Sequence, residues 1–170
     1  FRNASKFMDD VAFALIGDKY AMINKEGDLL TVPKFESFSN ISENGYIAVM
    51  EDGKWGYVKA DTRYAINPKF SSVSRFSDGV AVVSVNGTYG YIGEDGEYTI
   101  APQFDLAMSF SQNGMAAIKV GDEWGYIDET GTAVIEPHFE EAYSFVGDYA
   151  VVKLYGEYGL INSEGNYVIE

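Results

Sequence analysis

One short motif recurs five times along the 170-residue chain, and this repetition constrains the fold more than any other feature. An aromatic residue followed by a small one stands at Tyr20-Ala21, Trp55-Gly56, Tyr89-Gly90, Trp124-Gly125 and Tyr158-Gly159. Successive aromatic residues are separated by 35, 34, 35 and 34 positions. The prolines keep the same register, at Pro33, Pro68, Pro102 and Pro137, each two residues before a phenylalanine. A period of this length indicates a repeat architecture, in which each unit buries its apolar surface mainly against its neighbours.

The register divides the chain into units of about 34 residues within a single repeat domain. We expect a half-repeat at 1–18, full repeats at 19–53, 54–87, 88–122 and 123–156, and a partial repeat at 157–170. The sequence therefore opens and closes in mid-repeat. This arrangement predicts either a piece of a longer array or a closed ring in which the two end pieces complete one unit.

Each repeat has the pattern of short strands joined by tight turns. The alternating segment 80–85 is followed by Asn86-Gly87, a strong signal for a two-residue hairpin because both positions tolerate a positive φ. A second strand follows at 89–92, and Gly96 then supplies a left-handed turn residue before a third strand at 98–100. No window has helical periodicity, so we expect little helix.

Two local features qualify this pattern. The proline after the third strand is expected to end the strand, leaving a loop or short turn before the next repeat. Thr62 stands where other repeats have the turn glycine, so that turn is expected to be built differently.

The fold class that follows is all-β, with tandem hairpin repeats stacked in a solenoid-like, superhelical array. A closed five-fold propeller-like ring is the alternative. We favour the open array because units of this length leave little room for four strands in each propeller blade.

Composition excludes several functional classes. The chain has 12 Lys and Arg against 26 Asp and Glu, a net charge of −14 that would repel nucleic acid. It has no cysteine, which excludes disulfides and cysteine-based zinc sites. The purest apolar run, Val11–Ile16, is too short for a transmembrane segment, which needs about 20 residues.

Residues for catalysis or metal binding are scarce. His138 is the only histidine, and its equivalents in other repeats are Lys34, Lys69 and Gln103, which indicates a solvated polar position. Without a second histidine or any cysteine, the usual nucleophile and base pairs lack a member. The acidic turns lack the alternating ligand spacing of a calcium loop. We therefore expect no enzyme, no cofactor and no metal.

The repeated aromatic residues are the candidate ligand-binding positions. They are the first aromatic of the motif and the tyrosine two residues later: Trp55, Tyr57, Tyr89, Tyr91, Trp124 and Tyr126. Either they stack between repeats as core, or they form an exposed row that binds a glycan or a protein. Val58, Ile92 and Ile127 lie on the opposite strand face. One face must then be core and the other can be partly exposed.

The motif resembles the WG, or KWG, β-repeat family. Lys54-Trp55-Gly56-Tyr57-Val58 and Glu123-Trp124-Gly125-Tyr126-Ile127 match its aromatic-Gly-Tyr pattern, and Ile66-Asn67-Pro68-Lys69-Phe70 and Ile135-Glu136-Pro137-His138-Phe139 match its Ile-x-Pro-x-Phe pattern. The resemblance covers essentially the whole chain, although Tyr replaces Trp in three of the five motifs. It implies a repeat fold with a binding or scaffold role, in multi-repeat bacterial proteins that are often exported.

The sequence thus predicts a non-catalytic binding module that recognises a glycan or protein partner through its repeated aromatic positions. The alternative is a structural spacer or self-assembling element of a bacterial surface protein. Self-association is compatible with both. The acidic composition, rich in Tyr and Gly, favours an extracellular or cell-surface location.

Overall fold

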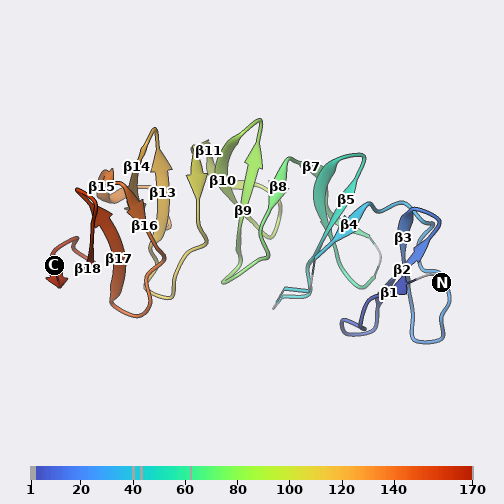
Figure 1. Cartoon of the computed structure of the whole chain (residues 1–170). Helices are drawn as coiled ribbons and strands as arrows, with labels where there is room; N and C mark the ends of the chain where they lie inside the picture. The colour runs from blue at the N-terminus through green and yellow to red at the C-terminus, as the bar shows by residue number, and fades with distance from the viewer. Residues whose placement is uncertain (1–2, 40, 43, 62, 170) are drawn as a thin grey trace.

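Regular structure in this protein consists of β-strands packed into five small sheets. The computed structural model describes residues 3–39, 41–42, 44–61 and 63–169. No helix occurs in these ranges, so none of them forms a helix that could cross a membrane. Every pair of neighbouring strands is antiparallel, and Figure 1 shows the sheets side by side in chain order.

Sheets 1 to 5 are numbered from the N-terminus. Sheet 1 contains β1 (Asn3–Ala4), β2 (Ala12–Ile16) and β3 (Lys19–Ile23). Sheet 2 contains β4 (Ser37–Phe38), β5 (Ile47–Glu51), β6 (Lys54–Val58) and β7 (Tyr64–Phe70). Sheet 3 contains β8 (Ser72–Val73), β9 (Val80–Val85), β10 (Thr88–Gly93) and β11 (Tyr98–Phe104). Sheet 4 contains β12 (Leu106–Ala107), β13 (Ala116–Val120), β14 (Glu123–Ile127) and β15 (Ala133–Phe139). Sheet 5 contains β16 (Glu141–Ala142), β17 (Tyr149–Leu154), β18 (Glu157–Asn162) and β19 (Tyr167–Ile169).

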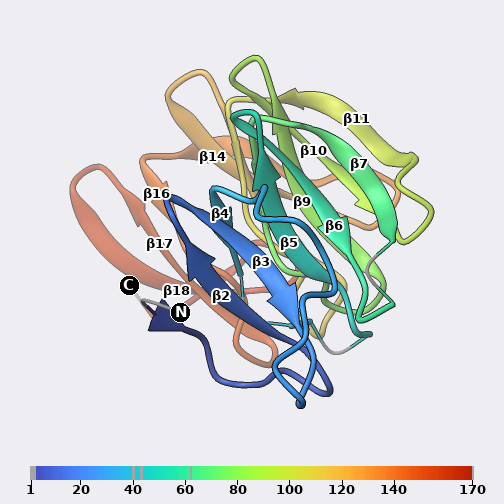
Figure 2. The same cartoon turned by 90° about the vertical axis from the view of Figure 1, so that its right-hand side faces the viewer.

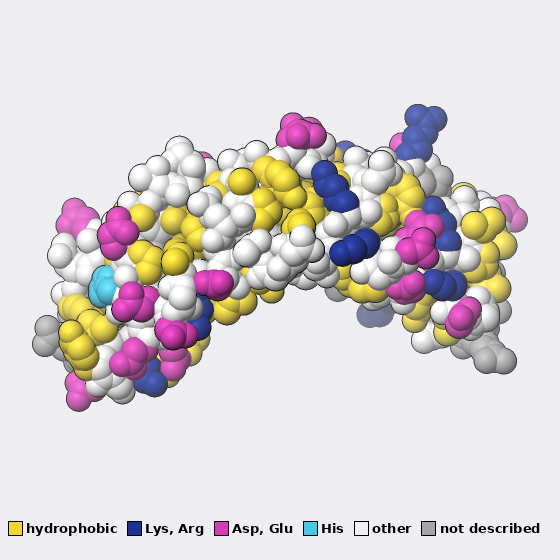
Figure 3. All heavy atoms as spheres, turned by 90° about the horizontal axis from the view of Figure 1, so that it is seen from above, with side chains coloured by type: hydrophobic (Ala, Val, Ile, Leu, Met, Phe, Trp, Pro, Cys, Tyr) yellow, Lys and Arg dark blue, Asp and Glu magenta, His cyan; other side chains and the backbone are white. Residues whose placement is uncertain are grey.

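The sheets form an open arc rather than a closed ring. Seen from above, the molecule curves from one end to the other (Figure 3), and sheets 1 and 5 lie at opposite ends (Figure 1). Viewed along the arc, the short first strands β4 and β16 lie on one side and the last strands β7 and β11 on the other (Figure 2). The short first strands therefore line the concave side, and the last strands line the convex side.

The predicted turns are confirmed. In the hairpin between β9 and β10, Asn86 and Gly87 have φ values of 52° and 90°, and Asp52-Gly53 and Tyr155-Gly156 repeat this geometry. The glycine turns after the second strand also have positive φ, as at Gly96 and Gly131. Because these conformations depend on two adjacent residues, sequence alone specifies them.

The predicted end of the third strand at proline is wrong. β7, β11 and β15 continue through Pro68, Pro102 and Pro137 to the following phenylalanine. The register explains this continuation: Trp124 pairs with Phe139 and Tyr126 with Ile135, so three residues of β15 bulge opposite a single glycine. An edge strand tolerates proline because one side of its backbone has no ladder partner.

Sheets 2 to 5 have four strands, which corrects the expectation that the units were too short for them. The additional strand is the two-residue first strand, such as β8, which pairs with the hairpin that follows it. It occupies the segment predicted to be loop. Thr62, where a differently built turn was predicted, lies outside the described residues.

The glycine of the motif permits close approach of this bulge. A Cβ atom added to Gly56, Gly90 or Gly125 would lie 2.5–2.6 Å from the carbonyl oxygen of Ile66, Ile100 or Ile135. None of the three glycines has a positive φ, so the requirement is for space and not for backbone conformation. Sheet 1 has Ala21 at this position, and its described residues form no regular strand equivalent to β7, β11 and β15.

Both faces of the internal sheets are buried, which corrects the prediction of one buried and one partly exposed face. The face that carries Tyr91 packs against the face of sheet 4 that carries Ile127. Tyr57 packs in the same way with Ile92. Each internal sheet is therefore enclosed between two neighbours, and the core is a series of layers between sheets.

Substituting Gly90 by Ala tests the close approach. The added methyl group would meet the backbone of Ile100 and Pro102 at 2.6 Å, and neither atom can move without the strand. Overpacking of this kind lowers the free energy of unfolding by about 1–3 kcal/mol. We therefore expect a clear fall in the urea midpoint of unfolding, measured by circular dichroism.

Gly93→Ala, on the same strand, is the matched control. Other repeats carry Lys59, Asp128 or Asn162 at this position, and the nearest atom to an added Cβ is a carboxylate oxygen of the exposed Asp95 side chain, not backbone. We expect a much smaller change. Equal losses for the two variants would contradict the backbone explanation.

Candidate functional site

Three of the six predicted ligand-binding residues are core residues. Tyr57, Tyr91 and Tyr126 have no exposed surface. Each hydroxyl donates a hydrogen bond of 2.7–2.8 Å to a backbone carbonyl 17 residues later, on Ser74, Met108 and Tyr143 respectively. These acceptors follow the short first strand of the next sheet. The hypothesis of an exposed aromatic row therefore does not describe these three side chains.

The other three candidates are half-buried. Trp55, Tyr89 and Trp124 each pack one side against the core layer beside them. Their role in binding stays a prediction. Tyr158, the last aromatic of the series, is 54% exposed on the outward face of sheet 5.

Two adjoining hollows lie on the concave side, and we call the two together the inner groove. The first, of about 420 Å³, is lined by residues that include Ser72, Val82, Tyr89, Met108 and Ser144. The second, of about 440 Å³, is lined by residues that include Ile41, Arg75, Phe76 and Ser77. Ser74 and Ser109 line both hollows, so the two adjoin. Sheets 2, 3, 4 and 5 or their loops all contribute.

The inner groove differs in charge from the rest of the surface. No Asp or Glu lines either hollow within the described ranges, although the chain has 26 of them. Arg75 is the only charged side chain among the described lining residues. The groove is thus a nearly neutral strip on a strongly acidic protein.

Several groove hydroxyls already have partners within the protein. The Ser72 and Ser84 hydroxyls lie 2.6 Å apart. Ser74 donates to the carbonyl of Arg75 at 2.9 Å and accepts from the Val82 amide at 2.9 Å. These bonds fix the groove wall. The half-buried Tyr89 and Met108 side chains then supply apolar contact surface.

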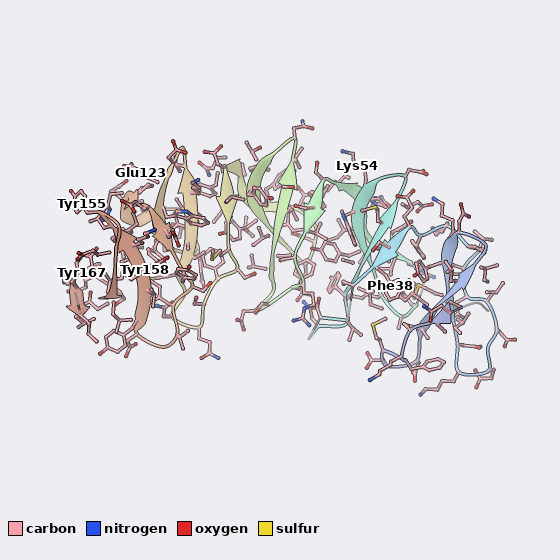
Figure 4. All side chains as sticks on the ribbon, viewed as in Figure 1. Phe38, Lys54, Glu123, Tyr155, Tyr158 and Tyr167 are labelled. Atoms are coloured by element: carbon pink, nitrogen blue, oxygen red, sulfur yellow. The ribbon has the colours of Figure 1, made fainter. Side chains whose placement is uncertain are left out.

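A further hollow, separate from the two of the inner groove, lies on the outward face of sheet 5. It has a volume of about 620 Å³ and is lined by Tyr143, Val146, Tyr149, Val151, Tyr158 and Leu160 together with Ser144. We call this surface the end face; Tyr158 is labelled near it in Figure 4. Ser144 also lines the inner groove, so the two surfaces adjoin.

The structure offers little for catalysis. His138 is exposed, as predicted, and its Nδ1 lies 2.6 Å from the carbonyl of Glu136. Within the described parts of the chain, no group of three His, Cys, Asp or Glu side chains is placed to hold a metal ion.

The sequence missed the inner groove. A signal was present, because Ser109 and Ser144 occupy equivalent positions in successive repeats.

Comparison with known proteins identifies the family. The model of the WG containing repeat matches residues 20–55, 55–89, 89–124 and 124–158. The chain belongs to this family. The resemblance inferred from the motif is thereby confirmed, and no curated protein matches the chain.

Solved structures of the β-propeller fold resemble this member of the WG containing repeat family. One is Kluyveromyces lactis Hsv2, with 11% sequence identity and a TM-score of 0.55 over 94% of this chain and 58% of that one. Another is a eukaryotic initiation factor, with 10% identity and a TM-score of 0.58 over 99% of this chain and 54% of that one. The chain thus spans less than two thirds of either protein. At this identity the likeness shows the fold, an all-β array of propeller-like sheets.

The buried tyrosines predict a specific response to alkali. Burial raises the pKa of Tyr57, Tyr91 and Tyr126 far above the ordinary value of 10. The folded state therefore keeps protons that the unfolded state loses, so stability is full below about pH 10 and falls as the pH rises above it.

Tyrosinate absorbance measured against pH tests this response. We expect three of the 13 tyrosines to ionise only as the fold is lost, and two in a Tyr126→Phe variant. Ionisation of all tyrosines near pH 10 with the circular dichroism unchanged would contradict it.

Proposed function

We propose that the chain is a non-catalytic binding module that holds an extended protein segment in the inner groove. The observation that carries this proposal is the neutral, partly apolar lining of the groove on a protein of net charge −14. Solvated surface in this chain is rich in carboxylates, so their absence from the lining of both adjoining hollows marks the inner groove as a contact surface. Tyr and Met are enriched at the cores of protein interfaces.

The shape of the groove favours an extended partner. Its residues come from four successive sheets, and its two hollows meet at Ser74 and Ser109. An extended segment can place successive side chains in neighbouring hollows, and the repeated contacts add to one another.

A protein segment suits this lining better than a glycan. Sugar hydroxyls are best matched by carboxylate, amide or guanidinium groups that bond two of them at once. Among the described lining residues only Arg75 is of this kind, and the hydroxyls of Ser72 and Ser74 are engaged internally. An extracellular or surface location in bacteria remains part of the proposal, and it rests on composition and on the resemblance.

Selection from a random peptide display library tests the proposal, with a glycan array run in parallel. Peptides selected on the 170-residue chain would be measured by fluorescence anisotropy. In a Ser109→Trp variant, an indole would fill the point where the two hollows meet. We expect affinity to fall at least about tenfold, which corresponds to about 1.4 kcal/mol.

Ser163→Trp is the matched control, because Ser163 is exposed in the turn between β18 and β19, away from the groove. It should bind like the parent chain. Peptides that bind both variants equally would contradict the groove as the site. Retention of glycans alone, lost in Ser109→Trp, would replace the protein partner with a carbohydrate.

A further inference from the structure

Arg75 is an exposed cation that lines the second hollow of the inner groove. Its backbone carbonyl accepts a hydrogen bond from Ser74, but within the described residues no ion pair or hydrogen bond engages its guanidinium. The chain has 26 Asp and Glu residues, so this guanidinium is unpaired on a protein rich in possible partners. Its five N–H donors therefore remain available to a bound molecule.

The position of Arg75 in the repeat places it on the same wall as other groove residues. Ser109 and Ser144 stand at the equivalent positions of the next two repeats, and both line the groove. Where those repeats present a hydroxyl, this one presents a permanent positive charge. Arg75 thus distinguishes one end of an otherwise neutral groove.

The backbone beside Arg75 offers little to an anion. The amides of Ser74, Phe76 and Ser77 donate within the chain at 2.8, 3.1 and 3.0 Å. A chain-terminal carboxylate is captured by a set of neighbouring free amides, and the segment 74–77 does not provide such a set. The guanidinium is therefore the group that a carboxylate in this hollow would meet.

We propose that the protein segment held in the inner groove carries an acidic side chain whose carboxylate pairs with the guanidinium of Arg75. This inference rests on the proposed function and adds the chemistry of the partner. The planar guanidinium matches a side-chain carboxylate with two parallel N–H···O bonds, which fixes the register of the segment as well as attracting it.

The charge of the protein makes this pairing selective. A net charge of −14 repels acidic segments from the surface in general, and Arg75 is the only charged side chain among the described residues of the groove lining. Further carboxylates along the segment would meet no cation there. The favoured segment therefore has one acidic side chain against Arg75 and apolar side chains against Tyr89 and Met108 in the first hollow.

Peptides selected on the 170-residue chain test the pairing by fluorescence anisotropy. We expect them to share one acidic residue. Arg75→Gln should weaken their binding at least about fivefold, and so should replacing that acidic residue of the peptide by its amide. The two changes together should weaken binding no more than either alone, because each removes the same pair. The urea midpoint of Arg75→Gln should equal that of the parent chain, since its guanidinium has no described partner within the protein.

Arg63→Gln is the matched control, because it changes the net charge equally. Arg63 is exposed immediately before β7 and does not line either hollow. This variant should bind the peptides like the parent chain. Equal losses in Arg63→Gln and Arg75→Gln would assign the effect to net charge and overturn the pairing.

Other outcomes separate this inference from the proposed function. Peptides that bind Arg75→Gln like the parent chain but lose affinity in Ser109→Trp would overturn the inference and leave the groove as the binding site. Peptides that need their free C-terminus, and no acidic side chain, would overturn it in the same way. Peptides that bind Ser109→Trp like the parent chain would overturn the proposed function itself.

Discussion

A buried tyrosine hydroxyl is the interaction on which the arrangement of the sheets depends. Tyr57, Tyr91 and Tyr126 fill the layers between sheets with their rings, but a hydroxyl left without an acceptor there would cost about 1–3 kcal/mol. The acceptor is in each case a backbone carbonyl 17 residues later, directly after the short first strand of the next sheet. This bond fixes where the next sheet begins. It also positions the inner groove, because the side chains of Ser74 and Met108, two of the acceptor residues, line it.

The motif glycine and the proline act together at the other edge of sheets 2, 3 and 4. The bulge that carries Pro102 approaches Gly90 too closely for any side chain. Proline in β7, β11 and β15 also removes an amide from the convex edge, where an unpaired strand could otherwise recruit another chain. The prolines of the repeat therefore discourage another strand from pairing with the convex edge. The repeat leaves contact surface on the concave side.

The sequence predicted the features that depend on a few neighbouring residues. Asn86-Gly87 and the glycine turns adopt the expected conformations because their backbone preferences are local. It did not predict the burial of both sheet faces, since Val58 and Ile92 are covered only by residues of the preceding repeat. The inner groove was missed for a related reason. Its walls join residues as distant as Ile41 and Ser109, which come together only when the sheets stack.

Charge separates the inner groove and the end face from the remainder of the molecule. A net charge of −14 keeps copies of the chain apart over long distances and weakens non-specific contact between their acidic surfaces. Within the described residues, neither the inner groove nor the end face has a carboxylate in its lining, so repulsion is weakest where apolar contact is available. The acidic surface therefore disfavours contacts elsewhere on the molecule, and a partner gains apolar contact only at these neutral surfaces. Added salt screens the repulsion and leaves apolar burial in place, so binding of an acidic partner in the inner groove should strengthen as ionic strength rises.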